Sequence, residues 1–557
     1  MRSAGRQSIS ERNVSTMDHE RPVVTAAKGK ARMVIVSNGF QRAPQILASY
    51  LEKITGCPFE VLPTPSPLYS FLFKKADHGD GGFAYRIQDK DVILEAGDED
   101  AAVFAVYDFL ERVAGCRYYT STCEVIPKDA CLTLSFPAYS YTPPITFREL
   151  YYRDYGDPVF AEKHKMAPFE AHKGWGFWCH SFQNLVSPEV YYDSHPEYFS
   201  LIDGVRVGKD AQLCLSNPEV LRITIENLRK EIEKNPQAKY WSVSQNDNAA
   251  YCQCEHCRKI DEEEGSPMGS VLRFVNQVAA AFPDKIISTL AYWYTRKPPK
   301  KVRPAENVHI MLCNIEANRG QPIGEDPRSK GSLEELKAWK EICGSLFLWD
   351  YCIQFRNLVS PFPNLRVLGP NMRLFVENNV KSLFSQSNRE LGGEFHELRG
   401  YMLAKLMWNP QLNEREIMLD FLHGYYRQAA PFLLEYIDRL HDNLEKAGGE
   451  LSIFGSPQDG KDSWLSPEQY RVYDELFDQA EKAAASDSEA LFRVRTARLA
   501  LWYAGISLEY GTPEERLNRI ARFAAQARKT GLIMVEEWEF TVDSFVTDAM
   551  AKLGQAQ

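Results

Sequence analysis

Short apolar runs alternate with amphipathic stretches along the first part of the chain. Apolar runs at residues 33–36 and 91–95 predict two strands, and helical spacing predicts helices over 44–54 and 101–113. Because strands alternate with helices, we expect a small α/β domain over residues 31–140. The Pro143-Pro144 pair follows this region and indicates a boundary. Residues 1–30 carry no such pattern, and we expect a disordered N-terminus there.

A second pattern occupies residues 141–400, where apolar or aromatic runs recur with amphipathic segments such as 220–233 and 271–282 between them. The predicted strands are 146–151, 178–182, 213–215, 241–244, 286–292, 308–313, 346–349 and 382–384. Eight strands separated by helices predict a (β/α)8 TIM barrel, so the fold class is α/β. From 401 to 557 the periodicity is helical nearly throughout, which predicts a helical C-terminal domain.

Composition and charge exclude some classes of binding partner for this chain. Its 557 residues exceed what one core usually organises, and 44% hydrophobic residues are typical of folded protein. A net charge of −10 without a basic run argues against nucleic acid or an anionic membrane surface. No apolar run is long enough to span a bilayer, and the first ten residues lack the apolar core of a signal peptide. We therefore expect a cytoplasmic protein, or an exported one whose signal is missing; the oligomeric state stays open.

In a TIM barrel, the residues that follow each strand converge on one rim, where active sites lie. Here those positions hold carboxylates, amides, a histidine and aromatic rings: Glu149, His180, Asn246, Asp247, Tyr292, Trp293, Glu316, Asp350, Tyr351 and Gln386. Carboxylates for proton transfer beside aromatic faces for sugar rings suit a glycoside hydrolase. Asp247 and Glu316 are the favoured catalytic pair, because each directly follows an apolar strand with polar amide neighbours.

Each of these residues also has a structural interpretation. Asp247 could cap a loop, and Glu149 or Asp350 could pair with a barrel arginine such as Arg148. Four tryptophans could be sugar platforms or could simply fill the barrel: Trp175, Trp178, Trp293 and Trp349. A carbohydrate-binding protein without turnover is thus an alternative, although a pure binder has little need of carboxylates at several strand ends.

A cysteine cluster follows Asp247 closely. Cys252, Cys254 and Cys257 form a C-x-C-x-x-C run, and Cys214 on a neighbouring segment could be the fourth ligand of a structural zinc. A metal-free loop with buried thiols or one disulfide is the alternative. Neither arrangement gives an open catalytic zinc, so no cofactor is expected for catalysis. We interpret the cluster as a structural element that holds the loop beside Asp247.

Several motifs together resemble a known family, the domain-of-unknown-function family 4838, which includes glycoside hydrolase family 163. The motifs are His195-Pro196-Glu197-Tyr198-Phe199, Gln212-Leu213-Cys214-Leu215-Ser216-Asn217-Pro218, Ser242-Val243-Ser244-Gln245-Asn246-Asp247, Pro361-Phe362-Pro363-Asn364-Leu365 and Ala404-Lys405-Leu406-Met407-Trp408-Asn409-Pro410. Residues 107–111 and 115–118 resemble the small α/β domain that precedes the barrel in hexosaminidases and α-glucuronidases.

The resemblance implies an endo-β-N-acetylglucosaminidase-like enzyme that cuts the chitobiose core of N-glycans. Related hexosaminidases use the substrate's own acetamide oxygen as the nucleophile and pass through an oxazoline. In that scheme Glu316 is the general acid/base and Asp247, with Asn246, positions the acetamide; the swapped roles are the alternative. His180, Tyr292, Trp293, Asp350, Tyr351 and Gln386 would line the sugar subsite. An α-glucuronidase or exo-hexosaminidase on the same fold remains a competing hypothesis, with Arg148, Arg153 and Arg319 available for a uronate.

Overall fold

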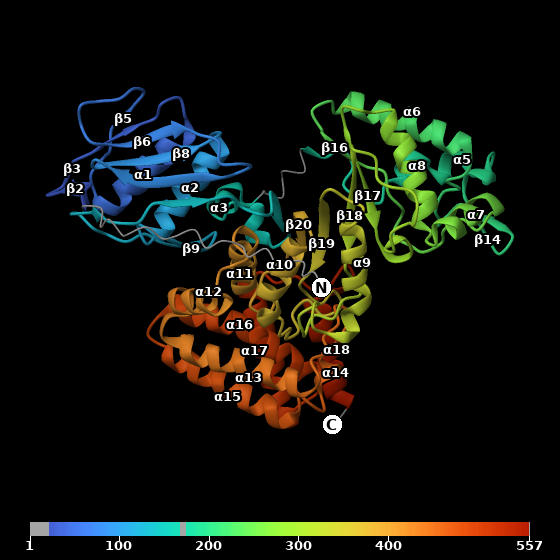
Figure 1. Ribbon diagram of the computed structural model, residues 1–557. Helices are drawn as coiled ribbons and strands as arrows, with labels where there is room; N and C mark the ends of the chain where they lie inside the picture. Colours follow the sequence, from blue (N-terminus) through green and yellow to red (C-terminus); the bar gives the residue numbers. More distant parts are fainter. Residues whose placement is uncertain (1–21, 167–173, 556–557) are drawn as a thin grey trace, which may run out of the picture. The chain divides into compact units, whose positions relative to one another are not determined.

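A computed structural model describes residues 22–166 and 174–555 (Figure 1). The chain divides into two compact units. The first contains the described residues up to Arg117 together with Val125–Pro143, and the second contains Tyr118–Glu124 and the chain from Pro144 onward. Most of the N-terminal stretch expected to be disordered, residues 1–21, lies outside the described residues. Residues 22–30, however, include the short strands β1 (Val23–Val24) and β2 (Ala26–Ala27).

The first unit is built on a six-stranded mixed sheet with two helices. The strand order is β12-β7-β8-β6-β4-β5, with β4, β5, β6 and β8 parallel and β7 and β12 antiparallel to their neighbours. The bounds are β4 Val34–Val36, β5 Val61–Leu62, β6 Ser70–Lys75, β7 Phe83–Gln88, β8 Asp91–Ala96, β12 Tyr139–Tyr141, α1 Arg42–Thr55 and α2 Glu99–Arg112. The two predicted strands and two predicted helices of this region are confirmed.

The second unit contains a curled parallel sheet of six strands in the order β13-β20-β19-β18-β17-β16. The bounds are β13 Phe147–Leu150, β16 Tyr240–Ser242, β17 Ile286–Ala291, β18 Val308–Cys313, β19 Leu346–Tyr351 and β20 Val380–Gln386. The intervening helices include α6 (Pro218–Lys234), α8 (Met268–Ala280) and α10 (Leu368–Glu377). These strands are buried almost throughout, as expected for a parallel sheet with covered faces.

Two of the eight predicted barrel strands do not form, so a closed eight-stranded barrel is not confirmed. In place of the strand expected at 178–182, only Trp175 makes a parallel bridge to Tyr240, and Phe182–Leu185 is a helical turn, α4. In place of the strand at 213–215, Leu213 makes a single antiparallel bridge to Phe199. Both runs lie in loops that are buried or half-buried, and short loops of this kind cannot be distinguished from short strands by hydrophobicity.

The C-terminal region is helical, as predicted. Its main helices are α11 His396–Trp408, α12 Glu414–Phe421, α13 Ala430–Lys446, α15 Pro467–Ala483, α16 Ser488–Ser507, α17 Pro513–Thr530 and α18 Val542–Gln555. Helices α13, α15, α16 and α17 pack in series and lie side by side in Figure 1. Before α18, a hairpin of β21 (Met534–Glu536) and β22 (Phe540–Thr541) interrupts the helical pattern, and the helical periodicity of this region did not predict it.

A hydrophobic core holds that hairpin in place. Val535 of β21 is fully buried together with Phe523 of α17, Phe545 of α18 and Val359 from the segment after β19. No helix among the described residues has both the length and the apolar character needed to cross a bilayer.

The approach of residues 174–177 to β16 gives a test of this architecture. Gly176 donates its N–H to the Tyr240 carbonyl at 2.8 Å, and a Cβ at Gly176 would lie 2.1 Å from the Trp241 ring. We expect Gly176→Ala to lower the free energy of unfolding by about 1–3 kcal/mol through overpacking, measured by urea titration of tryptophan fluorescence. Gly174→Ala is the matched control, because no atom lies within 4 Å of its added Cβ. Equal stability of the two variants would contradict the close packing of this segment on β16.

Candidate active site

A pocket of about 430 Å³ lies at the carboxyl ends of the parallel strands in the second unit. Its walls come from the residues that end or follow β16 to β20, and also from the C-terminal hairpin. The lining residues are Cys179, His180, Asp247, Leu290, Tyr292, Trp293, Cys313, Ile315, Trp349, Tyr351, Phe355, Gln386, Phe454, Glu537 and Trp538. Seven residues predicted from the sequence therefore share one cavity: His180, Asp247, Tyr292, Trp293, Trp349, Tyr351 and Gln386. Four others, Glu149, Asn246, Glu316 and Asp350, do not line it.

Asp247 is exposed toward solvent at the pocket, and its neighbours fix the loop that carries it. The Tyr292 hydroxyl donates to Asp247 Oδ1 at 3.1 Å. Asn246 is occupied in the loop itself: its side-chain amide donates to the Ala211 carbonyl at 2.8 Å and its Oδ1 accepts from the Gln183 N–H at 3.1 Å. Asn246 thus holds the backbone from which the Asp247 carboxylate projects.

Two lining residues have left-handed backbone conformations. The φ angles are 48° at His180 and 52° at Trp293, and neither residue is a glycine. Such backbone strain is frequent at functional sites, where the packing of the surrounding structure offsets its cost in free energy. His180 Nδ1 lies 2.8 Å from the Gln245 carbonyl, so a hydrogen bond orients this ring in the pocket wall.

Aromatic rings form much of the wall. Trp349 donates its Nε1–H to Gln386 Oε1 at 2.7 Å, and its ring is stacked at 24° to that of Tyr351. Trp293 is 40% exposed at the pocket, while Trp538 is 85% exposed. Trp175, in contrast, is buried and stacks on Tyr240, which favours its structural interpretation. A pocket lined by flat rings and by carboxylates suits a sugar ring.

Glu537 is a second carboxylate in this pocket that the sequence analysis missed. It lies in the turn between β21 and β22, and its N–H donates to the Phe355 carbonyl at 3.0 Å. Burial raises the pKa of the Glu537 carboxyl, a hydrogen bond with Trp538 opposes this, and the charge of Asp247 raises it further. The sequence signal was a tryptophan within the acidic run 536–539, which breaks the helical periodicity.

The two lining thiols have no nucleophilic character in this environment. Burial, and secondarily the charge of Asp247, raises the pKa of Cys179 to about 12. Burial also raises the pKa of Cys313. A raised pKa favours the neutral thiol, and the thiolate is the reactive form. Both residues therefore contribute to the wall of the pocket and not to its chemistry.

Glu316 and Asp350 lie beside the pocket, each paired with an arginine. Glu316 is exposed and forms an ion pair with Arg296. Its charge is near enough to contribute to the raised pKa of Tyr292, after burial and the larger effect of Asp247. Asp350 is buried; its Oδ1 accepts from Asn314 at 2.7 Å and from Arg319 at 3.2 Å. Asp350 therefore has the structural role of an arginine partner, although the partner is Arg319 and not Arg148.

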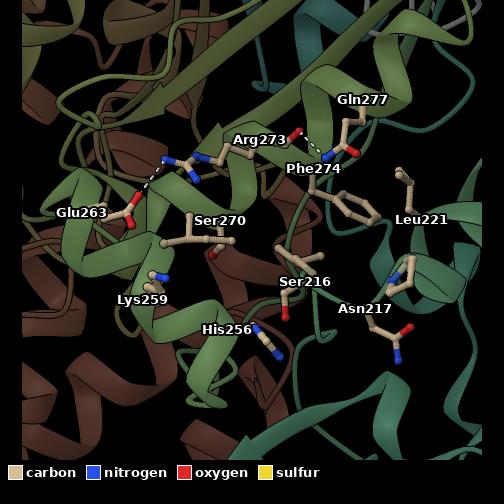
Figure 2. Close-up of a pocket in the computed structure, with 13 residues that line it drawn as sticks. Ser216, Asn217, Leu221, His256, Lys259, Glu263, Ser270, Arg273, Phe274 and Gln277 are labelled. Atoms are coloured by element: carbon tan, nitrogen blue, oxygen red, sulfur yellow. Dashed lines mark hydrogen bonds and ion pairs between the residues drawn. The ribbon is translucent and has the colours of Figure 1, made fainter.

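A second hollow, of about 410 Å³, lies between the start of α6 and helices α7 (Glu255–Glu264) and α8 (Figure 2). Ser216, His256 and Lys259 border it. Its one carboxylate is that of Glu263, which is ion-paired with Arg273 at 3.5 Å. With one carboxylate, already paired, and Phe274 as its one aromatic lining residue apart from His256, this hollow does not suit glycoside chemistry. The pocket at the strand ends is the candidate active site.

The contrast between the two arginine-paired carboxylates gives a test. We expect Asp350→Ala to lower the free energy of unfolding by about 3–5 kcal/mol, because it leaves the buried Arg319 guanidinium without its counter-charge. Glu316→Ala removes an exposed pair and should change this free energy by less than about 1 kcal/mol. Both are measured by urea unfolding. A larger loss for Glu316→Ala than for Asp350→Ala would contradict these roles.

Several solved structures of glycoside hydrolases are similar to this chain. A family GH115 4-O-methyl-α-glucuronidase with specificity for decorated arabinogalactans is similar with a TM-score of 0.54 and 9% identity, over 94% of this chain and 78% of that one. CpGH84B gives a TM-score of 0.46 and 11% identity over 95% and 98% of the two chains. A β-N-acetylhexosaminidase from Bacteroides fragilis NCTC 9343 gives 0.41 and 12% over 71% and 89%.

No curated protein matches the sequence. The family model of a domain of unknown function, DUF4838, matches residues 118–438, which is more than half of the chain and includes the six-stranded parallel sheet with Asp247 and the four clustered cysteines. The chain belongs to the DUF4838 family.

Proposed function

We propose that this protein is a glycoside hydrolase that cleaves β-N-acetylglucosaminide linkages in glycans, acting as an endo-enzyme of the glycoside hydrolase family 163 type on the N-glycan core. The observation that carries the proposal is the presence of two carboxylates, Asp247 and Glu537, in one aromatic-walled pocket at the strand ends. The fold shared with the GH115 glucuronidase supports a glycosidase in general. The N-acetylglucosamine specificity rests on the sequence motifs.

In the proposed mechanism the substrate's acetamide oxygen is the nucleophile. Asp247, held by the Tyr292 hydroxyl, accepts a hydrogen bond from the acetamide N–H and orients its oxygen toward the anomeric carbon. The bond from that carbon to the leaving oxygen breaks as Glu537 donates its proton to the leaving oxygen. Water then attacks the anomeric carbon of the oxazoline and gives a proton back to Glu537, which restores the acetamide and the enzyme.

Glu537 suits the acid role because its environment favours the protonated form. Burial and the adjacent Asp247 charge both raise the pKa of the Glu537 carboxyl. A carboxyl group whose pKa is raised by its environment is the usual choice of general acid in such a site. Glu316, the acid proposed from sequence alone, is engaged by Arg296 outside the lining of the pocket. It is the competing candidate in the experiment below.

The charged side chains that line the pocket are acidic, which favours a neutral sugar over a uronate as the substrate. None of the described residues that line the pocket is an arginine or lysine, whereas a uronate carboxylate is normally bound by such a cation. Arg148 and Arg319 are buried elsewhere: Arg148 donates to the Lys165 carbonyl, and Arg319 pairs with Asp350. An α-glucuronidase is therefore the weaker alternative.

The activity is tested by incubating the protein with an N-glycosylated protein and identifying the products by mass spectrometry. We expect release of glycans that leaves one N-acetylglucosamine on the protein, and no turnover of a uronate substrate. Asp247→Asn and Glu537→Gln should each lower kcat by about 10²-fold or more. Glu536→Gln is the matched control, since it lies in the same hairpin but does not line the pocket. Full activity of Glu537→Gln together with an inactive Glu316→Gln would transfer the acid role to Glu316; glycan binding without cleavage by the wild type would indicate a binding protein.

The pH dependence tests the coupling of the two carboxylates. A general acid is active while protonated, so activity should fall as pH rises through the pKa of Glu537. Because that pKa is raised, the alkaline limb should lie above the range of an ordinary glutamate. Asp247→Asn removes a negative charge that favours protonation, so the limb measured on the residual activity should move to lower pH. A limb unmoved in Asp247→Asn would show that another group provides the acid.

A further inference from the structure

We infer that Cys214, Cys252, Cys254 and Cys257 bind one zinc ion that fixes the loop carrying Asp247. The four residues come from two segments separated in sequence by a helix and a strand, α6 and β16, and all four are buried. Their sulfur atoms all lie within 4.8 Å of one another. Four thiolates in tetrahedral array are a typical structural zinc site.

The spacing of the sulfurs fits a single ion and not a disulfide. Cys214 Sγ and Cys254 Sγ are 3.7 Å apart. A Zn–S distance of about 2.3 Å in a tetrahedron requires sulfurs separated by about 3.8 Å. A disulfide requires about 2.05 Å, and all twelve cysteines of the chain are free.

The surroundings of the cluster suit anionic sulfurs better than neutral buried thiols. The Leu201 N–H donates to Cys252 Sγ at 3.3 Å, and the Arg206 guanidinium lies 3.9 Å from the same atom. The Ser216 hydroxyl lies 3.5 Å from Cys254 Sγ and can donate a hydrogen bond to it. Four thiolates with Zn²⁺ carry a net charge of −2, which a nearby cation and hydrogen-bond donors stabilise. A cluster of neutral thiols would not need a cation and hydrogen-bond donors beside it.

Local secondary structure brings the ligands together. Cys254 is the N-cap residue of α7 and Cys257 lies in its first turn. Cys214 follows Leu213, which is paired with Phe199, and precedes the start of α6 by four residues. The only apolar side chain packed on the cluster in the described part of the chain is that of Leu201, so few apolar contacts surround the four sulfurs themselves.

The cluster is connected to the pocket through Gln212, two residues before Cys214. Its side-chain amide donates to the Asn246 carbonyl at 2.9 Å and to the Asn248 carbonyl at 2.8 Å, and its Oε1 accepts from the Asn246 N–H at 2.8 Å. These bonds hold both sides of Asp247. A zinc ion that links Cys214 to residues 252–257 therefore keeps Gln212 next to residues 246–248. Asp247 is positioned in this way without touching the metal.

The metal is tested on the full-length protein, purified without added zinc, by elemental analysis and native mass spectrometry. We expect one zinc per chain, lost in Cys214→Ser and in Cys257→Ser and retained in Cys131→Ser, whose thiol is exposed and outside the cluster. Cobalt in place of zinc should give the absorption bands of a tetrahedral thiolate site.

A measurement on the wild type covers the case in which the serine variants fail to fold. Modification of thiols with a mercurial should release one zinc to a colorimetric chelator. Removal of the metal should raise amide hydrogen exchange in residues 245–252 more than in β17. Absence of metal with four protected but unmetallated thiols, a disulfide within the cluster, or iron in place of zinc would each overturn the inference. Zinc without any change in exchange at 245–252 would overturn the link to Asp247.

Discussion

The parallel hydrogen-bonded ladder from β13 to β16 is the constraint on which the candidate site depends. Parallel pairing points the carboxyl ends of all six strands to one edge, so the residues that follow the strands must meet there. Asp247, Tyr292, Tyr351 and Gln386 are distant in sequence and share a pocket for this reason alone. The buried apolar strands fix the register, and the loops are then free to carry polar groups and strained backbone such as that of His180.

The helical C-terminal region contributes directly to the pocket. The hydrophobic core of this region holds the β21–β22 hairpin in place, because the Val535 side chain of the hairpin is fully buried in that core. Backbone hydrogen bonds from Leu358 to Val535 and from Glu537 to Phe355 attach the hairpin to the segment after β19. Glu537 and Trp538 reach the pocket by this attachment. The charge of Asp247 then acts on Glu537 across residues almost three hundred positions apart in sequence.

Electrostatics divide the carboxylates near the sheet edge into two kinds. Asp350 and Glu316 have arginine partners, and their charges are compensated locally. Asp247 and Glu537 share the pocket with no lining arginine or lysine among the described residues, and burial together with the charge of Asp247 raises the pKa of the Glu537 carboxyl. This difference is the physical basis for assigning structural roles to the first pair and chemical roles to the second.

Hydrophobic periodicity by itself determined two strands and two helices of the first unit, the six strands of the parallel sheet and the helical tail, because each of these elements buries a regular apolar face. Four strands of the six-stranded sheet in the first unit, β5, β6, β7 and β12, were not predicted. It also placed Asp247, Tyr292, Tyr351 and Gln386 at strand ends, since the residue after a buried strand can be read directly. It assigned strands at 178–182 and 213–215, where buried loops carry the same apolar signal. Only the tertiary structure placed Glu537 in the pocket, paired Glu316 with Arg296, and selected Arg319 as the partner of Asp350. The sequence offered Cys214 as a companion of the other three cysteines, and the structure brings the four together. These outcomes depend on packing between distant segments, and local sequence does not encode which distant partner a side chain meets.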